Sequence, residues 1–175
     1  MLFRSVDSGW GLPVYWDAVN ASKNDNTIFQ DTINQCMKSA TEKPFFVIAD
    51  AGPDSHLSNE TVIENGVIPI IAARANSVGN ILKTKKESHF RAQYITRIYH
   101  KLLGKLYNIR TTVERKNSND VVGYNRSKTT TRGNEWAKIY VSISNIAALL
   151  TALTAFKVGR HDLIRAPGAF RKLNI

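Results

Sequence analysis

Asp50 is the first residue of this 175-residue chain whose type and position suggest chemistry. It ends the apolar run 45–49, at the carboxyl end of a predicted buried strand. Ligands of open α/β sheets bind in the crevice outside the carboxyl ends of the strands, so a carboxylate there is a candidate metal ligand. An aspartate before Ala-Gly-Pro is equally ordinary turn chemistry. The sequence gives these two interpretations of Asp50 equal weight.

A second group lies on a predicted helix. Tyr107, Arg110 and Glu114 stand at i, i+3 and i+7, which places them on one face of an α-helix. Taken alone, a glutamate flanked by Arg110 and Arg115 is better explained as part of an exposed lattice of ion pairs. Glu114 acquires a functional interpretation only when it is paired with Asp50.

The elements that must position these residues follow from local patterns. Hydrophobic periodicity and turn residues predict a hairpin, then a helix capped by Asn24 or Asp25, and then a strand, a short helix and a second strand. Strand, helix and strand at this spacing imply a parallel pair. The predicted ranges are 1–6 and 12–20 for the hairpin, a first helix ending before 44, a buried central strand at 45–49, a helix at 59–65 and a buried strand at 67–71.

Two long helices complete the chain. One runs from about residue 94 to 117, and the other from about 134 to 156. The first has an apolar face made of Ile98, Leu102, Leu106, Ile109 and Val113. The order of elements predicts an α/β, RNase H-like mixed sheet with flanking helices, whose first strand is missing. Residues 1–157 are expected to form a partial RNase H-like catalytic domain, and residues 158–175 a basic C-terminal tail.

The charge is unevenly distributed along the chain. Residues 1–73 carry 4 Lys and Arg against 9 Asp and Glu, whereas residues 74–175 carry 20 against 5, and the whole chain has a net charge of +10. A basic half of this size is expected of a protein that neutralises nucleic-acid phosphates. A basic solvated surface, or a patch for an acidic protein or an anionic lipid, is the alternative.

Composition also bounds the cellular context. The chain shows no secretory signal pattern, and its lone Cys36 is expected to be a buried thiol. The uncharged stretch 139–156 contains several Ser, Thr and Asn residues, so it favours a buried core helix over a membrane span. These features predict a cytoplasmic protein with no membrane partner, and the basic half, which favours nucleic acid, adds the expectation that it is nucleoid-associated.

Two motifs then resemble one known family, the insertion-sequence transposases with a DDE domain. The first is residues 47–55, Val-Ile-Ala-Asp-Ala-Gly-Pro-Asp-Ser, which is similar to the family's strand that ends in an aspartate. The second is residues 106–115, Leu-Tyr-Asn-Ile-Arg-Thr-Thr-Val-Glu-Arg, which is similar to its Y-x2-R-x3-E helix signature. The flanking residues 11–13, 66–71 and 132–133 also resemble the family's sequences, so the resemblance covers nearly the whole chain.

The resemblance implies roles for individual residues. Asp50 would be the second catalytic carboxylate and Glu114 the third, both holding Mg²⁺ or Mn²⁺ in a site that has two metal ions in the complete enzyme. Tyr107 and Arg110 would contact DNA phosphate. Further DNA-binding residues are expected among the neighbouring basic side chains, which are Arg115, Lys116, Arg126, Lys128 and Arg132.

The sequence departs from the family pattern in two places. Some relatives have a lysine seven positions after the glutamate, where this chain has Val121, and Lys116, Arg126 or Lys128 are the candidate substitutes. The family's first aspartate belongs on a strand before the opening hairpin. Asp7 is a weaker candidate for that role because it lies in a predicted turn, and Asp17 is weaker still because it lies within the next strand.

These inferences predict a DDE transposase that cleaves and transfers DNA strands during transposition of an insertion sequence, in a truncated copy that is weakly active or inactive. Its partners would be double-stranded DNA, at transposon ends and target, and a homodimer is one option for the complete enzyme. The alternative is a non-catalytic DNA-binding protein on an RNase H-like scaffold. A junction or repair nuclease of the same fold would need a complete carboxylate set.

Overall fold

The computed structural model describes residues 2–19, 22–72, 74, 104–123, 133–166 and 168, without the side chains of residues 2, 3 and 119–123. The chain divides into two compact units. Unit 1 combines Met1–Ala21 with Thr111–Ile175, and unit 2 is Ser22–Arg110. Each unit mixes helices with a small two-stranded sheet, which confirms the predicted mixed α/β class.

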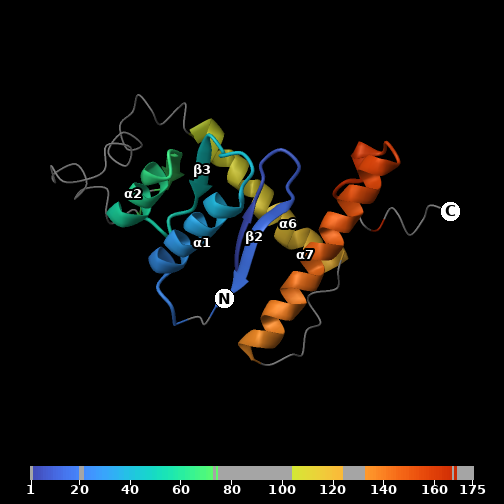
Figure 1. Cartoon of the computed structure of the whole chain (residues 1–175), viewed down its shortest axis with the longest axis horizontal. Coiled ribbons are helices and arrows are strands. Elements are labelled where there is room, and N and C mark those ends of the chain that lie inside the picture. Colours follow the sequence, from blue (N-terminus) through green and yellow to red (C-terminus); the bar gives the residue numbers. More distant parts are fainter. Residues whose placement is uncertain are drawn as a thin grey trace. The chain divides into compact units, whose positions relative to one another are not determined.

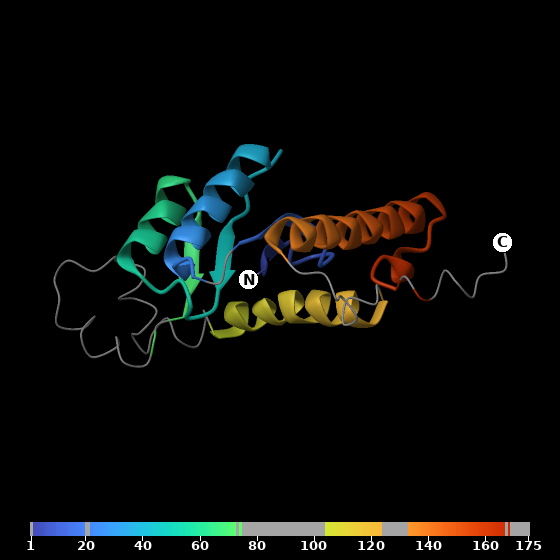
Figure 2. The same ribbon diagram turned by 90° about the horizontal axis from the view of Figure 1, so that it is seen from below.

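Unit 1 is built on the predicted hairpin. Strands β1 (Leu2–Val6) and β2 (Pro13–Ala18) pair antiparallel, with Phe3 opposite Asp17. Helix α6 (Thr111–Gly123) packs against β1, and helix α7 (Asn134–Lys157) packs against β2. The hairpin therefore lies between the two helices (Figure 2). The Trp16 Nε1 donates to Ser142 Oγ at 3.0 Å, and Lys138 pairs with Asp17 at 3.3 Å, which fixes α7 on β2.

The end of α7 closes a small core. The 3-10 turn η3 (His161–Leu163) folds back on the helix, and Ala152, Ala155, Leu163 and Ile164 are buried together. The Trp10 ring packs edge-on against Phe156, with centroids 5.3 Å apart. Arg165 donates to the carbonyl groups of Gly9 and Trp10, so the hairpin turn is tied to the residues after α7.

Unit 2 contains the predicted strand-helix-strand arrangement. Strands β3 (Phe46–Ala49) and β4 (Ile68–Ile71) are parallel, as expected, and helix α2 (His56–Glu64) connects them. Helix α1 (Asp25–Ser39) precedes β3 and packs against α2, and α2 packs on β4 (Figure 1). Ile28, Phe29 and Ile33 of α1 are buried in this core.

Local signals account for the boundaries of the helices. The Asn24 side chain accepts from the Asn26 N–H and caps α1, as predicted. Helix α2 begins three residues earlier than expected because Ser55 caps it by accepting from the Ser58 N–H. It ends before Gly66, whose φ of 77° favours glycine.

Three expectations about elements were wrong. Residues 45–49 are not a buried central strand, since Phe45 is 83% exposed and Phe46 is 39% exposed, and among the described residues β3 pairs with β4 alone. The helix around residue 110 is interrupted by a 3-10 turn, η1 (Asn108–Arg110), and continues to Gly123 rather than ending at residue 117. Ile109, expected on the apolar face of that helix, is 37% exposed.

Helix α7 has the predicted extent but is not a buried core helix. Among the described residues, it is the one helix that is long and apolar enough to span a membrane. A third of its apolar stretch is buried inside the fold. Its inward face carries small residues, such as Ala148 and Ala152, whereas large aliphatic side chains are exposed. Among the described residues, unit 1 therefore packs on the side of α7 that carries these small residues.

Candidate metal and DNA site

Asp50 lies directly after β3, at the carboxyl end of the parallel pair, as the sequence predicts. Its side chain is exposed, and its Oδ1 accepts from the Gly52 N–H at 3.1 Å. Among the described residues, no hydrogen bond engages Oδ2. Asp50 therefore makes the turn that its sequence context suggests and still presents a carboxylate oxygen outward.

Gly52 keeps space open beside this carboxylate. A Cβ at position 52 would lie 3.2 Å from Asp50 Oδ1 and 3.5 Å from Asp25 Oδ2. Two carboxylates, one from the end of β3 and one from the first turn of α1, therefore border a cradle that exists because residue 52 has no side chain. Carboxylate oxygens are the hard ligands that Mg²⁺ and Mn²⁺ prefer, so this donor chemistry fits a divalent cation.

Arg74 fixes the loop that follows Asp50. Its Nε donates to the Ala51 carbonyl oxygen at 3.0 Å, and its Nη2 donates to the Gly52 carbonyl oxygen. Its backbone N–H donates to Asp54 Oδ2 at 2.8 Å, and Asp54 is only 6% exposed. The residues after β4 thus hold the loop after β3 from two directions, which restricts the position of Asp50.

Tyr107 and Arg110 are close to one another. The Arg110 guanidinium carbon lies 5.4 Å from the centroid of the Tyr107 ring, a cation–π contact. Arg110 comes three residues after Tyr107, a spacing that places the two side chains on one side of a helical segment. The turn η1 that carries Arg110 packs against β3, the strand that leads to Asp50. The structure therefore brings Arg110, one of the two predicted phosphate contacts, to the strand that leads to the candidate ligand.

Glu114 lies in the first turn of α6, with an exposed side chain, and Arg115 beside it is also exposed. Lys116 is buried, with 6% of its surface exposed. Its predicted contact with DNA remains a prediction. Asp50 and Glu114 belong to different units, and their pairing remains a prediction. Within the described ranges no group of three or more His, Cys, Asp or Glu side chains could hold a metal ion.

Asp7 has a structural task. Its Oδ1 accepts from the Gly9 and Trp10 N–H groups, and its Oδ2 accepts from the Leu12 N–H, each at 2.9 Å. Both carboxylate oxygens thus organise the turn between β1 and β2, which supports the turn interpretation over the ligand interpretation.

The remaining basic candidates, Arg126, Lys128 and Arg132, and the side chain of Val121 lie outside the described residues. Sequence reasoning missed Asp25 and Arg74 as neighbours of the Asp50 loop. The sequence identifies Asp25 only as a possible helix cap, and Arg74 only as one of the 20 Lys and Arg residues of the basic half. No local pattern connects positions 25, 52 and 74, because the fold alone brings them together.

Comparison with known proteins gives one match. A family model described as "Transposase DDE domain" matches residues 6–150, most of the chain. No curated protein and no solved structure is detectably similar to it. The match spans both quoted motifs, including the strand that precedes Asp50 and the helical segment that carries Arg110 and Glu114. This chain belongs to the family of transposase DDE domains.

Proposed function

We propose that the chain is the catalytic part of a transposase that cuts the DNA ends of an insertion sequence and joins the freed 3′ hydroxyl to a target phosphodiester. The observation that carries this proposal is the carboxylate-lined cradle at the end of β3, formed by Asp50, Gly52 and Asp25 in a chain of this family. Enzymes of this family use divalent metal ions and act on DNA. The protein is proposed to act in the cytoplasm, at the nucleoid.

Asp50 and Glu114 would hold the metal ions, and Asp25 would add negative charge beside Asp50. Bound metal ions supply activation of the attacking oxygen and stabilisation of the leaving oxygen of an in-line phosphoryl displacement. The chain's own contribution is to orient the ligands. Arg74 does this for the Asp50 loop through the carbonyl groups of Ala51 and Gly52.

The basic side chains near the site would position DNA. Stacking on Tyr107 limits the freedom of the Arg110 guanidinium, so less conformational entropy is lost when it grips a phosphate. Arg115 is exposed next to Glu114 and would add a second phosphate contact. Arg126, Lys128 and Arg132 are retained as candidates on the same grounds of charge.

We further propose that the β3–β4 sheet is one part of a larger RNase H-like sheet, and that the first catalytic aspartate lies on a strand that pairs with β3. Support comes from β3 itself, an apolar strand that is half exposed although its partner β4 is mostly buried. A parallel pair normally lies within a sheet covered on both faces. Because the two carboxylates Asp50 and Glu114 alone make an incomplete ligand set, this chain is proposed to catalyse weakly or not at all.

Metal titration tests the assignment of Asp50. Purified chain is titrated with Mn²⁺ by isothermal calorimetry, next to Asp50→Asn and a matched control, Asp31→Asn, which changes an exposed aspartate of α1. Loss of a ligand should weaken the affinity at least about 10-fold in Asp50→Asn only. Equal affinity in all three proteins would leave Asp50 as a turn residue. Robust cleavage of DNA by this chain with Mg²⁺ or Mn²⁺ would contradict the proposal that the chain is weakly active.

The second candidate is a non-catalytic DNA-binding protein, favoured by the turn hydrogen bond that Asp50 makes to Gly52. A transposition assay in a longer relative separates the two. Substitutions equivalent to Asp50→Ala and Glu114→Ala should abolish transposition and leave DNA binding intact if the carboxylates are catalytic. Retained transposition would favour the binding protein.

A further inference from the structure

Helix α7 has two unlike faces. The face toward β2 buries small or polar side chains, including Ser144, Asn145 and Ala148. The opposite face exposes six large apolar side chains at 48% to 60%, here called the α7 stripe: Trp136, Ile139, Ile143, Ile146, Leu150 and Leu153. Large aliphatic groups gain the most free energy from leaving water. Because α7 exposes them and buries alanine, we expect another surface to cover this face in the functional state.

The spacing of the α7 stripe identifies the kind of surface that fits it. Successive members are separated by 3, 4, 3, 4 and 3 residues, the heptad pattern whose side chains follow one side of a helix. Such a stripe packs along its whole length against another helix at a shallow crossing angle. Helix α7 has 24 residues and is about 36 Å long, so the matching surface is a long apolar helix.

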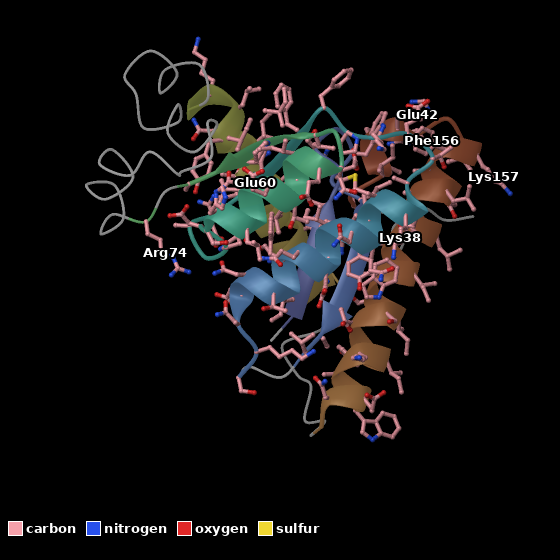
Figure 3. The ribbon with its side chains drawn as sticks, turned by 60° about the vertical axis from the view of Figure 1, so that its left-hand side comes forward. Lys38, Glu42, Glu60, Arg74, Phe156 and Lys157 are labelled. Atoms are coloured by element: carbon pink, nitrogen blue, oxygen red, sulfur yellow. The ribbon has the colours of Figure 1, made fainter. Side chains whose placement is uncertain are left out.

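We propose that the α7 stripe pairs with the same stripe of a second copy of this chain, with the two helices antiparallel. Glu135 lies in the first turn of α7 and Lys157 in the last, where its side chain points outward (Figure 3). An antiparallel pair places Glu135 of each copy near Lys157 of the other and aligns opposite ends of the helix dipoles. A parallel pair would place like charges together at both ends.

The area of the stripe suits a dimer. Side chains of this size present on the order of 200 Å² when fully accessible, so six at about half exposure offer roughly 600 Å² per copy. Two copies would bury roughly 1,200 Å², the lower end of the range for specific interfaces. Leu149, 36% exposed at the margin of the stripe, adds to this area.

A lipid bilayer suits α7 less well than a second helix does. A membrane span is apolar on all sides, whereas the face of α7 opposite the stripe carries Asn145, and Lys138 pairs with Asp17 of β2. Placing α7 in a bilayer would separate it from the hairpin. The dimer keeps every contact that α7 makes within unit 1. This inference is independent of the proposed catalytic function.

Sedimentation equilibrium of the full chain tests the pairing. We expect a monomer–dimer equilibrium whose dissociation constant rises at least 100-fold in Ile143→Glu and in Leu150→Glu. The matched control is Leu57→Glu, a 62% exposed leucine on α2, which should leave the constant unchanged. Circular dichroism establishes that each variant is folded. A chain that is monomeric at all concentrations, or a dimer insensitive to Ile143→Glu, would overturn the proposal.

A charge swap tests the antiparallel arrangement with exposed residues that do not endanger folding. Glu135→Lys and Lys157→Glu should each weaken the dimer about 10-fold, and the double variant should restore it. The two residues are 22 positions apart on one helix, too far to interact within one copy. No restoration in the double variant, or α7-dependent flotation with phosphatidylcholine vesicles in place of dimerisation, would overturn the assignment.

Discussion

Ser144 and Ser142 of α7 differ in their hydrogen bonds. Ser142 Oγ accepts from Trp16 Nε1, whereas Ser144 Oγ is buried with no hydrogen-bond partner among the described residues. Ser144→Ala should raise the free energy of unfolding by about 1 kcal/mol, because it removes an unsatisfied buried hydroxyl. Ser142→Ala has the same gain in helix propensity but should lower that free energy by about 1 kcal/mol. Urea denaturation measures both, and equal shifts would refute the difference.

Gly52 is predicted to matter for metal affinity. Gly52→Ala places a methyl group 3.2 Å from Asp50 Oδ1, so the carboxylate must shift and Mn²⁺ affinity should fall on the order of 10-fold. Gly104→Ala is the control, since no atom lies within 4 Å of its added Cβ. Calorimetric titration compares the two variants, and an unchanged affinity in Gly52→Ala would place the metal elsewhere.

At the scale of elements, β4 offers a matched pair of isoleucines. Ile70 is fully buried, whereas Ile68 is 38% exposed. Ile70→Ala should lower the free energy of unfolding by about 3 kcal/mol through lost burial and a residual cavity, and Ile68→Ala by about 1 kcal/mol. Chemical denaturation gives both values. Similar losses would mean that Ile68 is covered by something outside the described residues.

Elements set by local chemistry could be predicted from the sequence. The hairpin, the Asn24 cap, the end of α2 before Gly66 and the parallel pairing of β3 with β4 all depend on residues close in sequence. The exposure of β3 and of the outer face of α7 could not be predicted from the sequence. A run of apolar residues indicates that a surface favours burial, but it does not indicate which element covers that surface. The 3-10 turn at η1 leaves no clear pattern in composition.

The candidate site divides in the same way. Asp50 was placed correctly at a strand end, since the apolar run and the Ala-Gly-Pro turn mark it locally. Asp25 and Arg74 lie 25 residues before and 24 residues after Asp50 in the sequence. Only the tertiary fold brings them to the loop that follows Asp50. Whether Glu114 joins Asp50 depends on contacts between the two units and remains a prediction.

For the whole molecule, a net charge of +10 predicts DNA binding that weakens steeply with salt. Each neutralised phosphate contributes about −0.9 to the slope of log K against log salt concentration. Arg110→Ala should reduce that slope by about one, as expected for a lost phosphate contact. Lys38→Ala, an exposed lysine on α1, is the control and should not change the slope. Fluorescence anisotropy with duplex DNA measures these slopes, and equal slopes would remove Arg110 from the interface.

The outer edge of β3 gives the molecule one more property. The Phe45 and Ala49 carbonyl groups accept from Ile68 and Ala72 of the β4 side, so by strand alternation the backbone groups of Phe46 and Ile48 point the other way. An edge of this kind is a template for an added strand. A peptide of suitable apolar sequence would dock there by β-augmentation, which would give the chain a backbone-mediated way to bind another polypeptide.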